Sequence, residues 1–267
     1  MRGLPSFLII GGKRCGTTTL YWHLLQHPCV LPILPRAKRI KGIHFFDWNF
    51  DRGVGWYRSH FPTKLYRMAM TRRHGCEPVS GEASSTYLFH PYAPQRAQLV
   101  APGAKIIVLL RDPVARAWSH YRARVRKGEE PLSFEEAIEA EPERLRGERE
   151  RLEQDPARRS YPLEQQAYVA LGLYLDPLSE WMRRFHRDRV LILRTEDLGR
   201  DAPQTYRRVL QFMELPDWTP TTFRAFNAAP GSEEMRPETR TELLARFSPH
   251  NQRLSRYLGM ELGWDGA

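Results

Sequence analysis

The chain has 267 residues, enough for one large domain or two small ones, and its 41% hydrophobic and 27% charged residues are typical of a protein with a buried core. No apolar run is long enough to cross a bilayer, and the short flank before the first apolar run is unlike a signal peptide, so we expect a cytoplasmic protein. The formal charge of +10 favours anionic partners, but it does not distinguish nucleic acid from a phosphorylated nucleotide or an acidic glycan.

The cysteines at positions 15, 29 and 76 are odd in number and show no CxxC spacing. This pattern favours reduced thiols over a disulfide framework or a zinc site. Cys15 lies between glycines, where a small side chain suits a tight turn.

The chain opens with a predicted strand, a glycine loop and a helix. Phe7–Ile10 is an apolar run, glycines follow at 11, 12 and 16, and helical periodicity begins after the threonines. A glycine loop that leads into a helix N-terminus offers unpaired N–H groups and a positive dipole end to an anion. We therefore expect a phosphate site formed by Lys13, Arg14, Cys15, Gly16, Thr17, Thr18 and Thr19.

This loop differs from the Walker A pattern of nucleoside triphosphatases. Gly12 and Gly16 have the right spacing, but Thr17 stands where the pattern has lysine, so a magnesium-dependent enzyme fits poorly. An ordinary strand-turn-helix connection, in which glycine and threonine only turn and cap, is the alternative interpretation.

Basic and aromatic residues follow a short predicted strand at Cys29–Leu34. Arg36, Lys38, Arg39 and Lys41 precede Ile43–Trp48. Such a stretch fits nucleic-acid binding, an anionic substrate cleft, or a solvated loop before a core cluster. Further along, we predict a short helix over Gly53–Phe61, a polar loop over 67–78, and a strand end within 79–87.

The strongest strand signal is Ala104–Leu110, whose unbroken apolar run indicates a central strand buried on both faces. Arg111 follows it directly, at the strand end where open α/β sheets bind ligands, and Ser119 lies on the predicted next helix. Opposite charges at helical spacings predict exposed helix over 131–166. We interpret 131–160 as a charged helical insertion or lid without chemistry of its own.

The last predicted strand is Val190–Leu193, and amphipathic helices are expected at Thr205–Met213 and within Thr239–Leu258. Strands that alternate with helices imply a parallel sheet covered on both faces. We predict a single α/β domain over residues 1–267.

In order and spacing, segments along nearly the whole chain resemble the sulfotransferases that use 3′-phosphoadenosine 5′-phosphosulfate (PAPS). The likeness is greatest to the branch that includes the heparan sulfate sulfotransferases and many bacterial relatives. The markers are GGKRCGTTTLYWHLLQHP at 11–28, HFFDWNFDRGVGWYRSHFP at 44–62, GEASSTYLFHP at 81–91, IIVLLRDPVARAWSHY at 106–121 and LRTEDL at 193–198, with PHNQRL and a GW pair near the end.

The resemblance implies a P-loop-like fold whose opening loop holds the 5′-phosphosulfate, with Arg14 in place of the family's loop lysine and Gly16, Thr17 and Thr18 around the phosphate. It also implies that Arg111 and Ser119 hold the 3′-phosphate. Cations and helix-end amides then neutralise the transferred group without a metal, and PAP is the product. The acceptor is a hydroxyl, or less readily an amine, of a carbohydrate, glycolipid or small molecule; no nucleic-acid partner is expected.

Two positions depart from the heparan-type pattern. Gly42 replaces a glutamate that acts as base, and Ala83 replaces a lysine. His44 is our first candidate for the base because neutral imidazole accepts a proton near neutral pH, followed by Glu82 and Asp47.

Lys41, Phe46 and Asp47, in the basic and aromatic stretch, are expected to line the acceptor site. By the same resemblance, the loop 226–236 closes over the nucleotide, and Gly231 and Arg236 would contact it. A P-loop kinase, a nucleic-acid-binding protein and a family member that has lost catalysis are the competing hypotheses.

Overall fold

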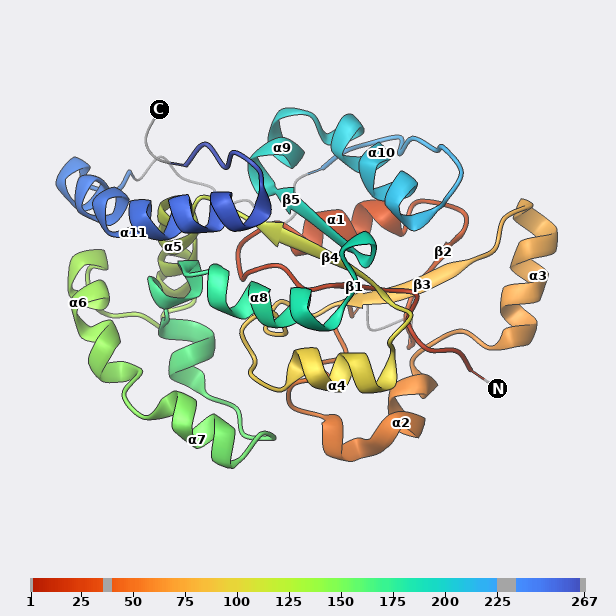
Figure 1. Cartoon of the computed structure of the whole chain (residues 1–267), viewed down its shortest axis with the longest axis horizontal. Helices are drawn as coiled ribbons and strands as arrows, with labels where there is room; N and C mark the ends of the chain where they lie inside the picture. The colour runs from red at the N-terminus through yellow and green to blue at the C-terminus, as the bar shows by residue number, and fades with distance from the viewer. Residues whose placement is uncertain (1, 36–39, 225–233, 265–267) are drawn as a thin grey trace.

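The computed structural model describes residues 2–35, 40–224 and 234–264. Five parallel strands form one sheet in the order β2-β3-β1-β4-β5 (Figure 1). Their bounds are β1 Phe7–Ile9, β2 Val30–Leu31, β3 Val79–Ala83, β4 Lys105–Leu110 and β5 Val190–Arg194. The predicted strands are all present, and β4 is flanked by strands on both sides, as its unbroken apolar run indicated.

Helices cover both faces of the sheet. They are α1 Thr17–Leu24, α2 Gly53–Ser59, α3 Lys64–His74, α4 Ala93–Val100, α5 Pro113–Val125, α6 Phe134–Arg144, α7 Glu148–Gln154, α8 Leu175–Arg184, α9 Thr195–Arg200, α10 Ala202–Met213 and α11 Pro237–Leu258. None of these helices combines the length and the apolarity that a bilayer span requires.

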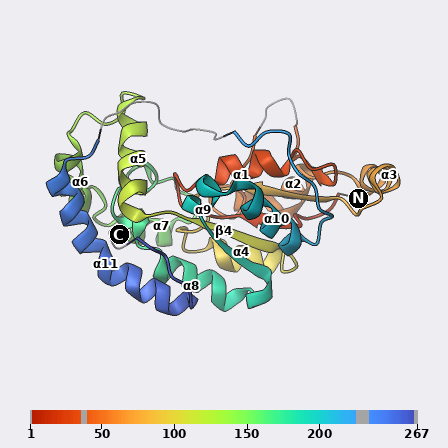
Figure 2. The same cartoon turned by 90° about the horizontal axis from the view of Figure 1, so that it is seen from above.

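Alternate residues of β1 belong to different cores, because successive side chains of a strand point to opposite faces. Leu8 packs in a cluster with residues of α4 and α8, whereas Phe7 and Ile9 pack with residues of α1 and α10. The predicted α/β fold, a parallel sheet with helices on both faces, is confirmed. A third cluster joins α5, α6 and α11 beyond the carboxyl end of β4 (Figures 1 and 2).

Residues 67–78, predicted as a polar loop, instead contain most of helix α3. Thr63 caps this helix by accepting a hydrogen bond from the Tyr66 N–H at 3.2 Å, and Gly75 ends it with a positive φ. None of its residues is buried, and it lies at the end of the molecule opposite α6 (Figures 1 and 2). A helix without a buried face has no apolar periodicity, so the sequence pattern could not reveal it.

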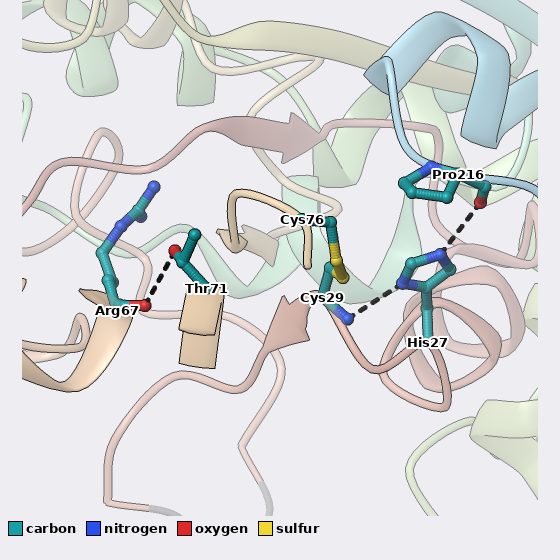
Figure 3. Close-up of a disulfide and its surroundings, with 6 residues drawn as sticks. All are labelled: His27, Cys29, Arg67, Thr71, Cys76 and Pro216. Atoms are coloured by element: carbon teal, nitrogen blue, oxygen red, sulfur yellow. Dashed lines mark hydrogen bonds between the residues drawn. A yellow bond between two sulfur atoms is a disulfide. The ribbon is translucent and has the colours of Figure 1, made fainter. Parts of the chain in front are cut away.

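A disulfide joins Cys29 to Cys76, so the expectation of reduced thiols is wrong for this pair (Figure 3). Cys29 lies just before β2 and Cys76 just before β3, and these strands are parallel neighbours in which Val30 pairs with Val79. Because parallel neighbours start at the same edge, the two cysteines meet there. Cys15 remains a free, buried thiol.

Replacement of Cys76 by serine is expected to lower the free energy of unfolding by about 3–4 kcal/mol, because the bridge closes a long loop in the unfolded chain. The two cysteines lie 47 positions apart. Urea unfolding with and without reductant measures the effect, and reductant should not weaken the variant further. Three titratable thiols in the denatured, unreduced wild type would contradict the pairing.

Candidate active site

The glycine loop is fixed between the ends of β1, β4 and β5. A Cβ on Gly11 would lie 2.4 Å from the carbonyl oxygen of Leu109, so β4 leaves no room for a side chain there. The Thr195 hydroxyl, directly after β5, donates a hydrogen bond shared by the carbonyls of Cys15 (2.8 Å) and Leu110 (2.9 Å). Gly16, with φ +81°, begins α1 without a side-chain cap, which leaves first-turn N–H groups for a ligand.

Arg14 brings together the two residues expected to hold a 3′-phosphate. Its Nε donates to the Ser119 hydroxyl at 3.1 Å, and its carbonyl accepts from Arg111 Nη1 at 3.2 Å. Burial lowers the pKa of Arg14, and the nearby charges of Arg111, Arg126 and Arg124 lower it further. A crowded, partly buried group of guanidinium ions is suited to a phosphate dianion. Arg14 therefore belongs to this group of guanidinium ions, although its place in the loop is that of the family's lysine.

Lys13 extends in another direction from the loop. Its Nζ donates to the Glu164 carbonyl at 2.6 Å and to Gln165 Oε1 at 2.8 Å, both in the short helical segment Pro162–Gln166. Burial, followed by the charge of Arg124, lowers the Lys13 pKa to about 7. The loop therefore directs its two cations to different parts of the molecule.

Lys41 supplies an ammonium group to the start of α1. Its Nζ contacts the Thr17 hydroxyl at 3.4 Å and the Ala83 carbonyl at 3.1 Å. Burial lowers its pKa to about 8, opposed by the charge of Glu82. Although position 83 has no lysine side chain, a lysine from the neighbouring segment thus lies against the same residue.

The alkaline limb of kcat/KM is expected near pH 8, with about a tenfold loss for each further pH unit, because the Lys41 ammonium then loses its proton. The pKa of Lys41 in the free enzyme governs the pH dependence of kcat/KM. Lys41→Arg should shift the limb upward, and a pH series of initial rates measures it. Lys13→Met is the matched control and should keep the limb near pH 8; an unchanged limb in Lys41→Arg would contradict the assignment.

Gly42 is enclosed by the end of β3. A Cβ at this position would lie 2.6 Å from Ser84 Oγ and 2.9 Å from the Ala83 carbonyl oxygen. The backbone here therefore leaves no space for a glutamate like that of the heparan-type pattern.

Glu82 is fully buried and holds this region together. Its carboxyl group accepts four hydrogen bonds, from the Ile43 N–H (2.6 Å) and the hydroxyls of Tyr57 (2.8 Å), Ser84 (2.7 Å) and Tyr87 (2.9 Å). Such contacts orient the segment that carries His44, whose N–H donates to the same Ser84 hydroxyl at 3.3 Å. A side chain enclosed in this way has no exposed atom to offer an acceptor.

His44 and Asp47 form a dyad. His44 Nδ1 and Asp47 Oδ2 are 2.9 Å apart, and the Thr86 hydroxyl contacts both side chains. Because the Asp47 carboxylate accepts a hydrogen bond from Nδ1–H, the neutral ring has its free lone pair on Nε2. The ring stacks on Trp48 at 4.0 Å, and the His44 side chain is 28% exposed whereas that of Asp47 is 0%. The imidazole is therefore accessible, while the carboxylate can only orient it.

Asp47 is suited to that orienting role. Burial alone would raise its pKa, but hydrogen bonds from His44 and Thr86 and from the Trp48 N–H outweigh burial and lower it. The carboxylate consequently stays ionised beside the ring.

Other predicted site residues lie elsewhere. Phe46 is fully buried in the aromatic core and Cys15 beneath the loop, so neither side chain is exposed. Burial raises the Cys15 pKa to about 11, which makes its thiol unreactive. Arg236 is exposed at the start of α11, and Gly231 and the basic residues at 36, 38 and 39 lie outside the described residues.

Sequence reasoning missed Thr195 and Thr86. Both follow the carboxyl end of a parallel strand, β5 and β3, which is the signal that could have found them. In the described parts of the chain, no group of three His, Cys, Asp or Glu side chains could hold a metal ion.

A cavity of about 440 Å³ adjoins the dyad. Trp48 and Thr86, which both contact His44, line it together with Lys13. Leu152 and Leu163, both within the charged stretch 131–166, line it too, so this charged segment helps to enclose the cavity.

Comparison with known proteins matches residues 4–235 to the sulfotransferase domain family. The chain is 29% identical to human bifunctional heparan sulfate N-deacetylase/N-sulfotransferase 3 over 96% of its own length but 30% of that protein's. It is 27% identical to mouse heparan sulfate glucosamine 3-O-sulfotransferase 3A1, covering 98% of this chain and 65% of that one. It spans less than two thirds of either relative.

A crystal structure of a sulfotransferase from Alicyclobacillus acidocaldarius is 31% identical and has a TM-score of 0.72, covering 97% of this chain and 98% of that chain. The family model and this structure both span most of the sequence; the model runs from before the glycine loop to just before α11. The chain therefore belongs to the sulfotransferase family.

Proposed function

We propose that this chain transfers the sulfuryl group of PAPS to an acceptor hydroxyl and releases PAP. The observation that carries the proposal is the contact of Arg14 with Ser119 and Arg111. Arg14 belongs to the glycine loop, and the helix that follows this loop begins at Thr17, which contacts Lys41. One loop thus connects a cation group suited to a 3′-phosphate with a helix N-terminus suited to a 5′-phosphosulfate.

In this mechanism, His44 Nε2 takes the proton of the acceptor hydroxyl while Asp47 keeps the proton on Nδ1. A bond forms between the acceptor oxygen and sulfur, and the bond from sulfur to the phosphate oxygen breaks. The electron pair stays on that oxygen, where Lys41 and the N–H groups at the start of α1 stabilise the charge. Glu82 acts as a positioning residue.

The heparan sulfate relatives, an N-sulfotransferase and a 3-O-sulfotransferase, support an amine or a hydroxyl as the acceptor group. For the molecule that carries this group, the sequence predicts a carbohydrate, a glycolipid or another small molecule, and it predicts no nucleic-acid partner. A cytoplasmic location stays a prediction, and the disulfide weighs against it because cytosolic thiols are normally kept reduced.

Calorimetric titration is expected to show that PAP binds and that ADP binds much more weakly, because only PAP has a 3′-phosphate. Arg111→Ala should weaken PAP binding about 10- to 100-fold and leave ADP unchanged, since it removes charge-assisted hydrogen bonds to that group. Arg253→Ala, an exposed arginine on α11, is the matched control and should bind PAP as the wild type does. Equal affinity of the wild type for PAP and ADP would refute the proposal.

A further inference from the structure

Two residues that line the cavity beside the dyad also contact the His44 ring. Thr86 lines it and contacts His44 Nδ1 at 3.2 Å, and Trp48 lines it while stacking on the same ring. The Arg159 guanidinium lies 4.0 Å over the Trp48 ring and pairs with Glu164 at 2.9 Å, so the charged segment is joined to the dyad. A molecule in the cavity would therefore contact two residues, Thr86 and Trp48, that hold the His44 ring.

The walls of this cavity are mainly apolar. Its aliphatic and aromatic lining comes from three separate stretches of chain, after β3, in the charged segment and before α8, and includes Leu88, Phe89, Leu152, Leu163, Leu171 and Leu173. All six are buried or half-buried. Its volume of about 440 Å³ lies in the range of small-molecule sites.

The charged groups of the lining balance one another. Three cations, Lys13, Arg149 and Arg158, stand against three carboxylates, Glu164, Asp176 and Glu180. His90 adds no charge near neutral pH, because burial lowers its pKa to about 4.

Several of these charges also have partners within the protein. Lys13 is bound by the segment Pro162–Gln166, Arg149 pairs with Glu153 at 3.3 Å, and Glu180 pairs with Arg184 at 2.6 Å. The cavity therefore offers no excess of positive charge to a polyanion, despite the net charge of the whole chain.

We propose that the acceptor is a single, largely apolar alcohol, such as an aromatic or aliphatic one, and not a sulfated or carboxylated glycan chain. This inference rests on the proposed function. Apolar walls stabilise an apolar body by removing its surface from water, whereas the anionic groups of a glycan would lose their hydration there without cations to replace it. The residues of the charged segment would then select the acceptor, a role that their sequence did not suggest.

The test measures transfer from PAPS to 2-naphthol, to 1-octanol and to a desulfated heparan oligosaccharide, by PAP release and by mass of the product. We expect kcat/KM for the better alcohol to exceed that for the oligosaccharide at least about tenfold, given the transfer energy of one buried apolar group. Leu163→Arg, which places a cation in the wall, should lower kcat/KM for the alcohol about tenfold. Leu99→Arg, at a residue 75% exposed on α4, is the matched control and should not.

Titration with PAP accompanies each assay. If PAP binds but the oligosaccharide is preferred, or neither alcohol is sulfated, the acceptor inference is overturned while the donor assignment stands. If PAP does not bind, the proposed function fails and the inference with it. Equal loss of alcohol transfer in Leu163→Arg and Leu99→Arg would also overturn the inference.

Discussion

Replacement of His44 by glutamine is expected to lower kcat about 10²- to 10⁴-fold, because the variant lacks the base that removes the acceptor proton. PAP affinity should be unchanged, because the His44 side chain bonds to Asp47 and Thr86 and not to the glycine loop. Initial rates at saturating donor, with calorimetry on the same protein, separate these two effects. The outcome would distinguish an active enzyme from a family member that only binds nucleotide.

His186→Gln is the matched control, because His186 has an 82% exposed side chain and pairs with Asp188 on the surface. Asp47→Asn adds a second check, since an amide in place of the carboxylate no longer favours the tautomer with its proton on Nδ1. It should lower kcat as well, without weakening PAP binding. Full activity of His44→Gln would exclude the histidine as base and direct attention to the acceptor's own ionisation.

Replacement of Glu82 by alanine is expected to lower the free energy of unfolding by at least about 4 kcal/mol, because four buried donors lose their acceptor at once. Removal of one partner from a buried hydrogen-bonded group costs far more than the bond itself contributes, since the remaining donors have no water to replace it. Urea unfolding monitored by aromatic fluorescence measures the loss.

Glu214→Ala is the matched control, because this glutamate is 84% exposed and its pair with Lys105 lies at the surface, where ion pairs contribute little. Glu82→Gln separates positioning from proton transfer. If Glu82 were the base, this variant would keep its stability and lose kcat completely, a result that would contradict the positioning role. A variant that loses stability and rate together supports it.

The family assignment removes the P-loop kinase hypothesis, which rested on the likeness of the glycine loop to Walker A. Thr17 in place of the Walker lysine already weighed against it. In the fold, the ammonium that contacts Thr17 belongs to Lys41, at a distance of 3.4 Å. The charge that a Walker lysine supplies locally is thus supplied from the segment after β2.

Local patterns in the sequence determined the strands, most helices, the strand-loop-helix course of the glycine loop and the family. They do so because burial on both faces of a parallel strand leaves an unbroken apolar run, as in Lys105–Leu110, and because glycines mark places where the backbone must turn or approach closely. The prediction failed for α3, which buries no residue and so has no periodicity, and for Cys29 and Cys76, whose pairing depends on strand order.

Only the tertiary structure decided how the site is assembled. Arg14 meets Ser119 across 105 residues, Lys41 meets Ala83 across 42, and residues of the charged segment line the cavity beside His44. No short-range pattern records such contacts, because parallel strands and their crossovers bring distant segments to one edge of the sheet. The sequence by itself determined where the cationic, hydroxyl and imidazole side chains stand along the chain. The fold decided which of them meet, because the meeting depends on strand order and helix packing.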